Sequence, residues 1–431
     1  MSSVLHTADN AALSNPLSRS AWGRREPALS SAANERGAGE VSAKASATLI
    51  SAKPLHVFVL IDALGWEIIK DRPFLNAELP VRMPLKTVLG YSSGAIPTLL
   101  TGRLPAETGH WNLFYYDPQR SPFRWLRWFS VLPERVLDNR VGRKLIKEVG
   151  RRVLGMGPLF ECCVSPQLLP LFNYVEKLNI YQAGGIPGAD SIFDLLSRSG
   201  TPYKTYSYHH FSDAEILEQS YKDIASGGDH FYFLYLSQVD SFLHHRRNDD
   251  SVVTEQLHWY EHQLRKIFTC ARQRNADATM SVVSDHGMTP VHSTYDLVGR
   301  INQLGFEMPH QYLAVYDSTM ARYWFFDEAA RRAIAAELEA TSCGRILPDT
   351  ELEDLGVFFP DRRYGELVFL LDPGWLFARS DFNGGGWNPA GMHGYHPSDP
   401  NSDGIFLSNR PVAHPMRTIA DIYLCLEEAA S

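Results

Sequence analysis

The stretch HVFVLID, residues 56–62, decides the fold class of this chain. Residues 56–61 form an apolar run of the kind found in strands buried on both faces, and Asp62 follows it directly. The pattern returns in FYFLYL, residues 231–236, which leads to Asp240, and in MSVV, residues 280–283, which leads to Asp285. In open α/β sheets, ligands bind at the edge where the carboxyl ends of the strands lie. Because each of these strands is followed by an acid at that edge, the pattern predicts a ligand-binding site there as well as a sheet.

Helices are expected between these strands. In residues 251–275, apolar side chains recur at steps of three and four, which is typical of a helix that packs one face on a sheet. They are Val253, Leu257, Tyr260, Leu264, Ile267 and Ala271. The alternation of strands and helices predicts an α/β fold with a mainly parallel central sheet flanked by helices.

The chain is expected to consist of a tail and one large domain. Residues 1–53 are rich in Ala, Ser, Gly and Asn, which predicts a disordered N-terminal tail. Residues 54–431 are predicted to form one large domain with two inserted cap regions. A basic, aromatic and helical insert is expected at about 118–180, and a smaller α+β cap insert at about 293–383, where QYLAVYDS (311–318) and ARYWFF (321–326) suggest a hairpin.

The composition narrows the class of protein. The chain has 44% hydrophobic residues and a formal net charge of −8, which argues against a nucleic-acid polymer as its partner. Its five cysteines show neither a pairing framework nor the CxxC spacing of a metal site. No apolar run has the length of a signal peptide core or of a transmembrane span. These features predict a cytoplasmic protein.

Acids and histidines beside the expected strand ends form a candidate metal centre. The set is Asp62, Asp240, His244, Asp285, His286 and His393. Asp240 and His244 are four residues apart, so one helical turn places both on the same face. A mixed set of carboxylates and imidazoles without a thiolate suits Zn²⁺, with Mn²⁺ or another divalent cation as the alternative. Three protein ligands for each of two ions, about 3.5–4 Å apart, would leave open positions for a nucleophile and a substrate oxygen.

Two adjacent serines stand at an expected helix start. They lie in VLGYSSGAIPTLLTGRLPAETGHW, residues 88–111, as Ser92 and Ser93. Serine hydroxyls commonly cap helices by accepting hydrogen bonds from the first unpaired amides. The other interpretation is a serine nucleophile held where those amides stabilise negative charge.

The motifs occur in an order that resembles a known family. Strand-Asp, Ser-x₈-Thr-Gly, Asp-x₃-His, SDHGM (284–288) and HGY (393–395) follow one another along the chain. This order is similar to that of the alkaline phosphatase superfamily, most closely its type I phosphodiesterase / nucleotide pyrophosphatase branch, over about residues 55–411. The resemblance implies an alkaline-phosphatase-like fold.

The resemblance also implies roles for single residues. One metal would be held by Asp240, His244 and His393, and the other by Asp62, Asp285, His286 and the nucleophile. The nucleophile of the family lies nine residues before the Thr of the Thr-Gly pair, here Thr101, which selects Ser92 over Ser93. Many diesterases of this branch have Thr at that position. Asn112 and the backbone amide of Ser93 are the candidates for holding a phosphoryl oxygen, and His396 is the rival of His393.

The predicted function is that of a two-metal phosphodiesterase or nucleotide pyrophosphatase that forms a covalent phosphoserine on Ser92. A phosphomonoesterase or phosphonate hydrolase on the same bimetal site is the first alternative. A metal-stabilised binding protein that docks on anionic surfaces is the second. The expected partner is a small-molecule phosphoester, and the basic insert is a solvated cap face, a substrate contact or a membrane-surface contact. The organic group on the phosphate and the oligomeric state stay open.

Overall fold

The computed structural model describes residues 54–129, 138–153, 164–208, 211–381, 384–385 and 388–430 of the chain. The tail expected at 1–53 lies outside the described residues, and so do 130–137 and 154–163 of the basic insert.

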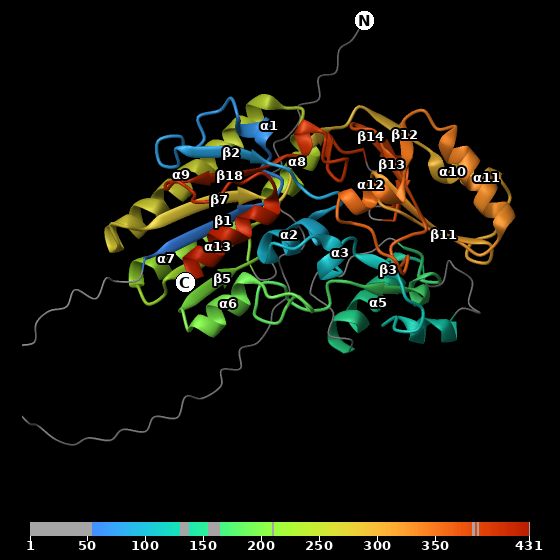
Figure 1. The fold of residues 1–431 in the computed structure, drawn as a ribbon, viewed down its shortest axis with the longest axis horizontal. Coiled ribbons are helices and arrows are strands. Elements are labelled where there is room, and N and C mark those ends of the chain that lie inside the picture. The colour runs from blue at the N-terminus through green and yellow to red at the C-terminus, as the bar shows by residue number, and fades with distance from the viewer. Residues whose placement is uncertain are drawn as a thin grey trace, which may run out of the picture. The chain divides into compact units, whose positions relative to one another are not determined.

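A six-stranded sheet forms the centre of the described region, in the order β2-β18-β7-β1-β6-β5 (Figure 1). Strands β1 (His56–Ile61), β5 (Tyr203–Tyr206), β6 (Phe231–Leu236) and β7 (Thr279–Ser284) run parallel to one another. Strand β18 (Gly404–Ser408) is antiparallel to β7 and to β2 (Val81–Leu85). The predicted α/β fold with a mainly parallel central sheet is confirmed.

Side chains of β1 alternate between two hydrophobic layers, which is why the whole run is apolar. Val57 and Val59 pack with residues of α9 (Asp250–Arg274) and α7 (Asp213–Ser226) on one face of the sheet. Phe58 and Leu60 pack on the other face with α2 (Ser92–Thr101), α6 (Ile192–Ser199) and α13 (Ile422–Ala430). Because successive strand residues point to opposite faces, a strand covered by helices on both sides has no polar face.

A second, antiparallel sheet occupies most of the expected α+β cap. Its order is β10-β11-β13-β12, and Figure 1 shows it beside the central sheet. The hairpin pairs β10 (Tyr312–Tyr316) with β11 (Met320–Phe325), followed by β13 (Leu367–Leu371) and β12 (Gly344–Leu347). Helices α10 (Leu297–Gln303) and α11 (Glu328–Glu339) cover this sheet through buried leucine and isoleucine side chains.

The described part of the basic insert contains one 14-residue helix and several short elements. These are helix α5 (Arg140–Val153), the 3₁₀ helices η1 (Arg124–Phe129) and η2 (Leu169–Leu171), and strand β4 (Phe172–Tyr174), which pairs with β3 (Phe114–Tyr116) just before the insert. Ile146 of α5 packs with Phe123 and Leu126, and the same cluster includes Trp324 of the cap sheet. The insert is thus anchored to the cap through its apolar side chains.

The remaining elements are short. They are α1 (Trp66–Ile69), α3 (Pro105–Thr108), α8 (Gln238–Arg246), β8 (Thr289–Pro290), β9 (Ser293–Tyr295), α12 (Asp349–Asp354), β14 (Trp375–Phe377), β15 (Arg379–Ser380), β16 (Gly384–Gly385), β17 (Gly391–Met392), η3 (Pro400–Ser402) and η4 (Ile419–Asp421). In the described ranges, no helix combines the length and the apolar character needed to cross a membrane.

Candidate active site

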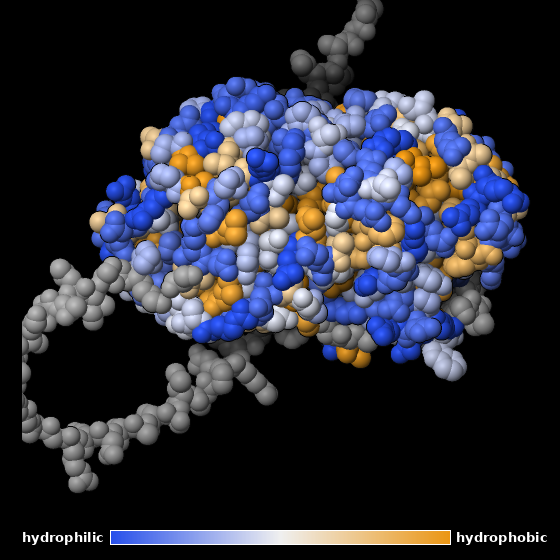
Figure 2. Space-filling model, viewed as in Figure 1, coloured by the Kyte–Doolittle hydropathy of each residue, from blue (hydrophilic) through white to orange (hydrophobic). Residues whose placement is uncertain are grey.

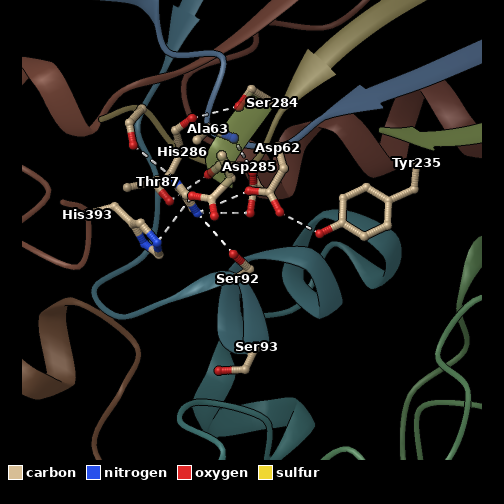
Figure 3. A network of polar contacts seen from close by, with 12 residues as sticks. Asp62, Ala63, Thr87, Ser92, Ser93, Tyr235, Ser284, Asp285, His286 and His393 are labelled. Atoms are coloured by element: carbon tan, nitrogen blue, oxygen red, sulfur yellow. Dashed lines mark hydrogen bonds and ion pairs between the residues drawn. The ribbon is translucent and has the colours of Figure 1, made fainter. Parts of the chain in front are cut away.

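The sheet brings acids from separate strands to one edge (Figure 3). Asp62 follows β1, and Asp285 with His286 follows β7, which is the neighbour of β1 in the sheet. Helix α8 follows β6 and carries Asp240 and His244 on consecutive turns. The four parallel strands end on the same side, so residues far apart in the sequence meet there.

Asp62, Asp285 and His286 form the first cluster, and each offers a ligand atom within 4.8 Å of the others. The imidazole Nε2 of His286 lies 3.5 Å from Asp62 Oδ1 and 3.3 Å from Asp285 Oδ2. All three side chains are buried. This is the set that the sequence predicted for one of the two metals, and its role as a ligand set stays a prediction.

Asp240, His244 and His393 form the second cluster, again within 4.8 Å of one another. Asp240 Oδ2 lies 3.4 Å from His244 Nε2, and Asp240 Oδ1 lies 3.5 Å from His393 Nε2. His393 follows β17, which pairs with β8 in an antiparallel bridge after the SDHG turn. The rival His396 instead lies 3.0 Å from Glu351 through its Nε2, away from this cluster.

The two clusters adjoin through histidine rings. The centroid of the His393 ring is 4.0 Å from that of His286 and 5.3 Å from that of His244. His393 therefore contacts a ligand candidate of each cluster. The six residues predicted from the sequence form one continuous site.

Two of the histidines are held in the tautomer that a metal requires. His244 Nδ1 lies 2.8 Å from the carbonyl oxygen of Gly391, and His286 Nδ1 lies 2.9 Å from that of Gly287. A carbonyl oxygen only accepts hydrogen bonds, so each Nδ1 carries the proton and each neutral ring keeps its lone pair on Nε2. Both Nε2 atoms point to the carboxylates, as expected of metal-ligating imidazoles with a supporting hydrogen bond.

Unpaired polar atoms show that the site fits cations. Among the described residues, Asp62 Oδ1, Asp240 Oδ1, Asp285 Oδ2 and His393 Nδ1 are buried and have no hydrogen-bond partner. A buried acceptor without a partner is destabilising, and most such atoms in proteins are paired. Cations held by the two clusters would give the three carboxylate oxygens partners.

The electrostatics of the site lead to the same conclusion. Burial and the nearby charges of Asp285 and Asp240 raise the pKa of Asp62 well above its ordinary value. Burial lowers the pKa of His393, and the neighbouring His286 adds to this effect. Converging carboxylates in a buried place repel one another, so a divalent cation bound there would favour their ionised form.

The structure distinguishes the two adjacent serines. The Ser92 hydroxyl lies 3.0 Å from His286 Nε2, at the first cluster. The Ser93 hydroxyl is buried and donates a hydrogen bond of 2.9 Å to the carbonyl oxygen of Trp111, and Figure 3 shows it pointing away from the cluster. Ser92 is thus placed as a nucleophile would be, whereas the Ser93 side chain has a structural partner.

The start of α2 also offers backbone donors. Ser92 and Ser93 are the first two residues of this helix. The first amides of a helix have no acceptor within it, and they favour anions. The predicted role of the Ser93 amide in holding a phosphoryl oxygen is compatible with this position.

Asn112 lies close to Gly90, in the loop before Ser92. Its side chain is buried, its Nδ2 donates only to Met320 Sδ at 3.8 Å, and its Oδ1 has no hydrogen-bond partner among the described residues. A Cβ added to Gly90 would lie 3.9 Å from Asn112 Oδ1. The amide is weakly engaged, and its role as a substrate ligand stays a prediction.

Two glycines of the motifs are required by close contacts. A Cβ on Gly287 would lie 2.2 Å from the carbonyl oxygen of Asn401, so only glycine fits after His286. Gly394 has a φ of +89°, and a Cβ there would lie 2.6 Å from Cε1 of Tyr91. These contacts explain why SDHG and HGY carry glycine directly after a ligand candidate.

Several side chains that support the site could not be predicted from the sequence. The Tyr235 hydroxyl donates to Asp62 Oδ2 at 2.5 Å, and the Thr87 hydroxyl donates to the Asp285 carbonyl oxygen at 2.7 Å. Tyr91 lies 2.9 Å from the hydroxyl of Thr319, which donates to the Gly394 carbonyl oxygen. Tyr235 lies in an apolar strand and Thr319 in the cap, so neither is marked by a motif.

Comparison with known proteins supports the family resemblance. Residues 190–396, just under half of the chain, match the family model described as type I phosphodiesterase / nucleotide pyrophosphatase. The match confirms the resemblance that the motifs indicated and supports a phosphoric ester hydrolase.

Solved structures of this family have the same fold. Murine ectonucleotide pyrophosphatase / phosphodiesterase 5 is 16% identical with a TM-score of 0.63, over 87% of this chain and 95% of that one. The human protein is 14% identical with a TM-score of 0.61, over 87% and 94%. An inactive variant of the murine protein in complex with AMP is 16% identical with a TM-score of 0.61, over 88% and 95%. At these identities the likeness establishes the alkaline-phosphatase-like fold. No curated protein matches the chain in sequence.

Proposed function

We propose that this phosphodiesterase / nucleotide pyrophosphatase uses Ser92 as its nucleophile and two divalent cations, with Zn²⁺ as the favoured metal. The observation that carries the proposal is the 3.0 Å distance between Ser92 Oγ and His286 Nε2, beside a cluster of buried carboxylates. The donors are carboxylate oxygens and imidazole nitrogens without a thiolate, a set that suits zinc.

The proposed ligands are the residues of the two clusters. Asp240, His244 and His393 would hold one ion, and Asp62, Asp285 and His286 the other. When bound, such ions lower the pKa of a coordinated hydroxyl and neutralise charge on phosphoryl oxygens.

The side chains and backbone of α2 would then carry the reaction. Ser92 Oγ attacks phosphorus, the ester P–O bond breaks, the hydroxyl proton passes to solvent and the departing group takes up a proton from water. Water next breaks the Oγ–P bond, which restores Ser92 and releases a phosphate monoester. The free amides at the start of α2 stabilise the phosphoryl oxygens while charge develops on them.

A nucleotide substrate is favoured among the phosphodiesters. A solved relative with the same fold, the inactive murine variant, was obtained in complex with AMP. In this chain Asn112 Oδ1 has no hydrogen-bond partner among the described residues and its Nδ2 donates only to Met320 Sδ, so this amide is the candidate for binding a phosphoryl oxygen. We expect a small-molecule nucleotide ester rather than a nucleic-acid polymer.

One pair of substrates tests the reaction type. Purified protein should hydrolyse bis-p-nitrophenyl phosphate and p-nitrophenyl thymidine 5′-phosphate faster than p-nitrophenyl phosphate, when compared by kcat/KM. Faster turnover of the monoester would favour the phosphomonoesterase alternative. Absence of turnover of every ester by metal-loaded protein would favour the binding-protein alternative.

A second experiment tests the metal. Dialysis against a chelator should abolish turnover, Zn²⁺ should restore it, and elemental analysis of the active protein should find about two ions per chain. Restoration by Mn²⁺ but not by Zn²⁺ would contradict the assignment of zinc.

A further inference from the structure

The basic insert carries a charge opposite to that of the rest of the chain. Residues 118–153 contain ten Lys or Arg and three Asp or Glu, whereas the whole chain has a net charge of −8. In the described part of the insert, Arg120, Arg124, Arg127 and Lys144 are exposed. The positive charge is therefore concentrated in one segment and accessible to solvent.

The same segment carries the most exposed large apolar side chains in the described part of the chain. Trp128 is 85% exposed, Val141 78%, Val153 74% and Leu145 60%. Elsewhere in the described residues, no large apolar side chain is more than 49% exposed. Exposed apolar residues that gather in one place mark interaction sites more often than single ones do.

Packing fixes which face of α5 is exposed. Ile146 is buried in the cluster with Phe123 and Leu126, and Gly150 one turn later is also buried. Val141, Lys144 and Leu145 lie on the opposite face, since residues three and four apart share one side of a helix. Figure 1 shows α5 at an edge of the described fold, away from the central sheet.

We propose that η1 and α5 form a docking surface for an anionic lipid membrane. The exposed face of α5 combines apolar side chains with lysine and arginine, as interfacial helices do. Trp128 in η1 adds an indole, a group that settles at the boundary between headgroups and acyl chains.

Two chemical properties of the surface favour a membrane over an acidic protein. Charge pairing alone would explain the exposed Lys144 and Arg124, but it gives no function to the exposed apolar side chains of Trp128, Val141 and Leu145. A bilayer with anionic headgroups satisfies both, because it presents negative charge and an apolar layer a few ångströms below. The surface lies outside the metal-ligand clusters, so docking and hydrolysis are separable.

Vesicle co-sedimentation of the full chain tests the proposal. The protein should bind vesicles of phosphatidylcholine mixed with phosphatidylserine, bind pure phosphatidylcholine much more weakly, and dissociate as salt is raised. Lys144→Gln should weaken binding roughly fivefold, the effect of one basic residue at an anionic surface. The double variant Val141→Ser with Leu145→Ser should weaken it further, since it removes the side chains that would enter the bilayer.

Matched variants elsewhere on the surface control for non-specific effects. Lys266→Gln on α9 removes an exposed lysine, and Trp259→Ala removes an indole that is 37% exposed. Neither should change vesicle binding, and all the variants should hydrolyse a soluble ester at the wild-type rate. Equal binding to neutral vesicles, equal losses in the control variants, or binding to polyglutamate but not to anionic vesicles would overturn the proposal.

Discussion

His286 and His393 stack in the site, with ring centroids 4.0 Å apart and ring planes inclined by 14°. One ring belongs to the cluster at the ends of β1 and β7, and the other to the cluster around α8. Because the rings are in contact, neither cluster can rearrange without moving a ligand candidate of the other. The two predicted metal sites are therefore expected to be coupled.

Replacement of His393 tests this coupling. His393→Gln should lower the metal content by about one ion per chain and weaken retention of the remaining ion, because the ring that His286 packs against is lost. We expect kcat/KM for a diester to fall by at least about a hundredfold. Elemental analysis after gel filtration and a chelator titration would measure both effects.

His396 provides the matched control. It lies three residues further along the same loop, where its Nδ1 lies 2.7 Å from the Ser398 hydroxyl and its Nε2 lies 3.0 Å from Glu351. His396→Gln should keep two ions and near-normal turnover. If it lost metal as His393→Gln does, the assignment of His393 as the ligand would be wrong.

Alanine substitutions of the two serines at the start of α2 should affect different properties, activity for Ser92 and stability for Ser93. Ser92→Ala should reduce kcat/KM by at least about a thousandfold with little change in stability, because it removes the nucleophile. Ser93→Ala should keep activity and lower the free energy of unfolding by about 1 kcal/mol, because its hydrogen bond to Trp111 is lost. Trapping of labelled phosphate on wild-type protein but not on Ser92→Ala would show the covalent step, and full activity of Ser92→Ala would rule it out.

Many residues of this site could be predicted from short-range patterns in the sequence. An acid at the end of a buried strand, as for Asp62, predicts a position at the sheet edge because parallel strands share that edge. Asp240 and His244 are related by one helical turn, which α8 provides. The family resemblance selects Ser92 as the candidate nucleophile by its spacing from Thr101, and the Ser92 hydroxyl lies 3.0 Å from His286 Nε2.

Contacts between segments that are far apart in the sequence could not be predicted from it. Tyr235 lies within FYFLYL, where periodicity predicts only a buried strand, yet its hydroxyl bonds to Asp62 from 173 positions away. Strand β18 is inserted antiparallel between β7 and β2, and no local pattern fixes that order. A helical insert was expected, but the exposure of Val141 and Leu145 on it depends on what the insert packs against.

The hydrogen bond from Tyr235 to Asp62 should hold that carboxylate in place for a metal. Tyr235→Phe removes a buried donor, which leaves Asp62 Oδ2 without this partner. We expect metal affinity to fall roughly 10- to 100-fold, as when partners of metal ligands are removed elsewhere. Tyr232→Phe on the same strand is the control, since its hydroxyl donates to the Asp223 carbonyl oxygen instead. Equal metal affinity of Tyr235→Phe and wild type, measured by competition with a chromophoric chelator, would contradict this role.

Glu176 should make the stability of the protein depend on pH. Burial raises the pKa of Glu176 to about 7. The unfolded chain ionises this group at its ordinary pKa of 4.5, so between about pH 4.5 and 7 the unfolded state loses a proton that the folded state keeps. The contribution of Glu176 to the free energy of unfolding is therefore fully present below about pH 4.5 and is lost as the pH rises through about 7.

Glu176→Gln removes this dependence, because glutamine does not titrate. The measured quantity is the unfolding free energy of the variant minus that of wild type, from urea denaturation. This difference should be about 1–3 kcal/mol larger at pH 8 than at pH 5. Glu215→Gln is the control, because backbone and hydroxyl hydrogen bonds from Ser212 lower the pKa of Glu215 below its ordinary 4.5. Its contribution to stability changes only below about pH 4.5, so the difference between that variant and wild type should stay constant from pH 5 to pH 8. A difference between Glu176→Gln and wild type that stays constant from pH 5 to pH 8 would show that the carboxyl is solvated in the folded protein.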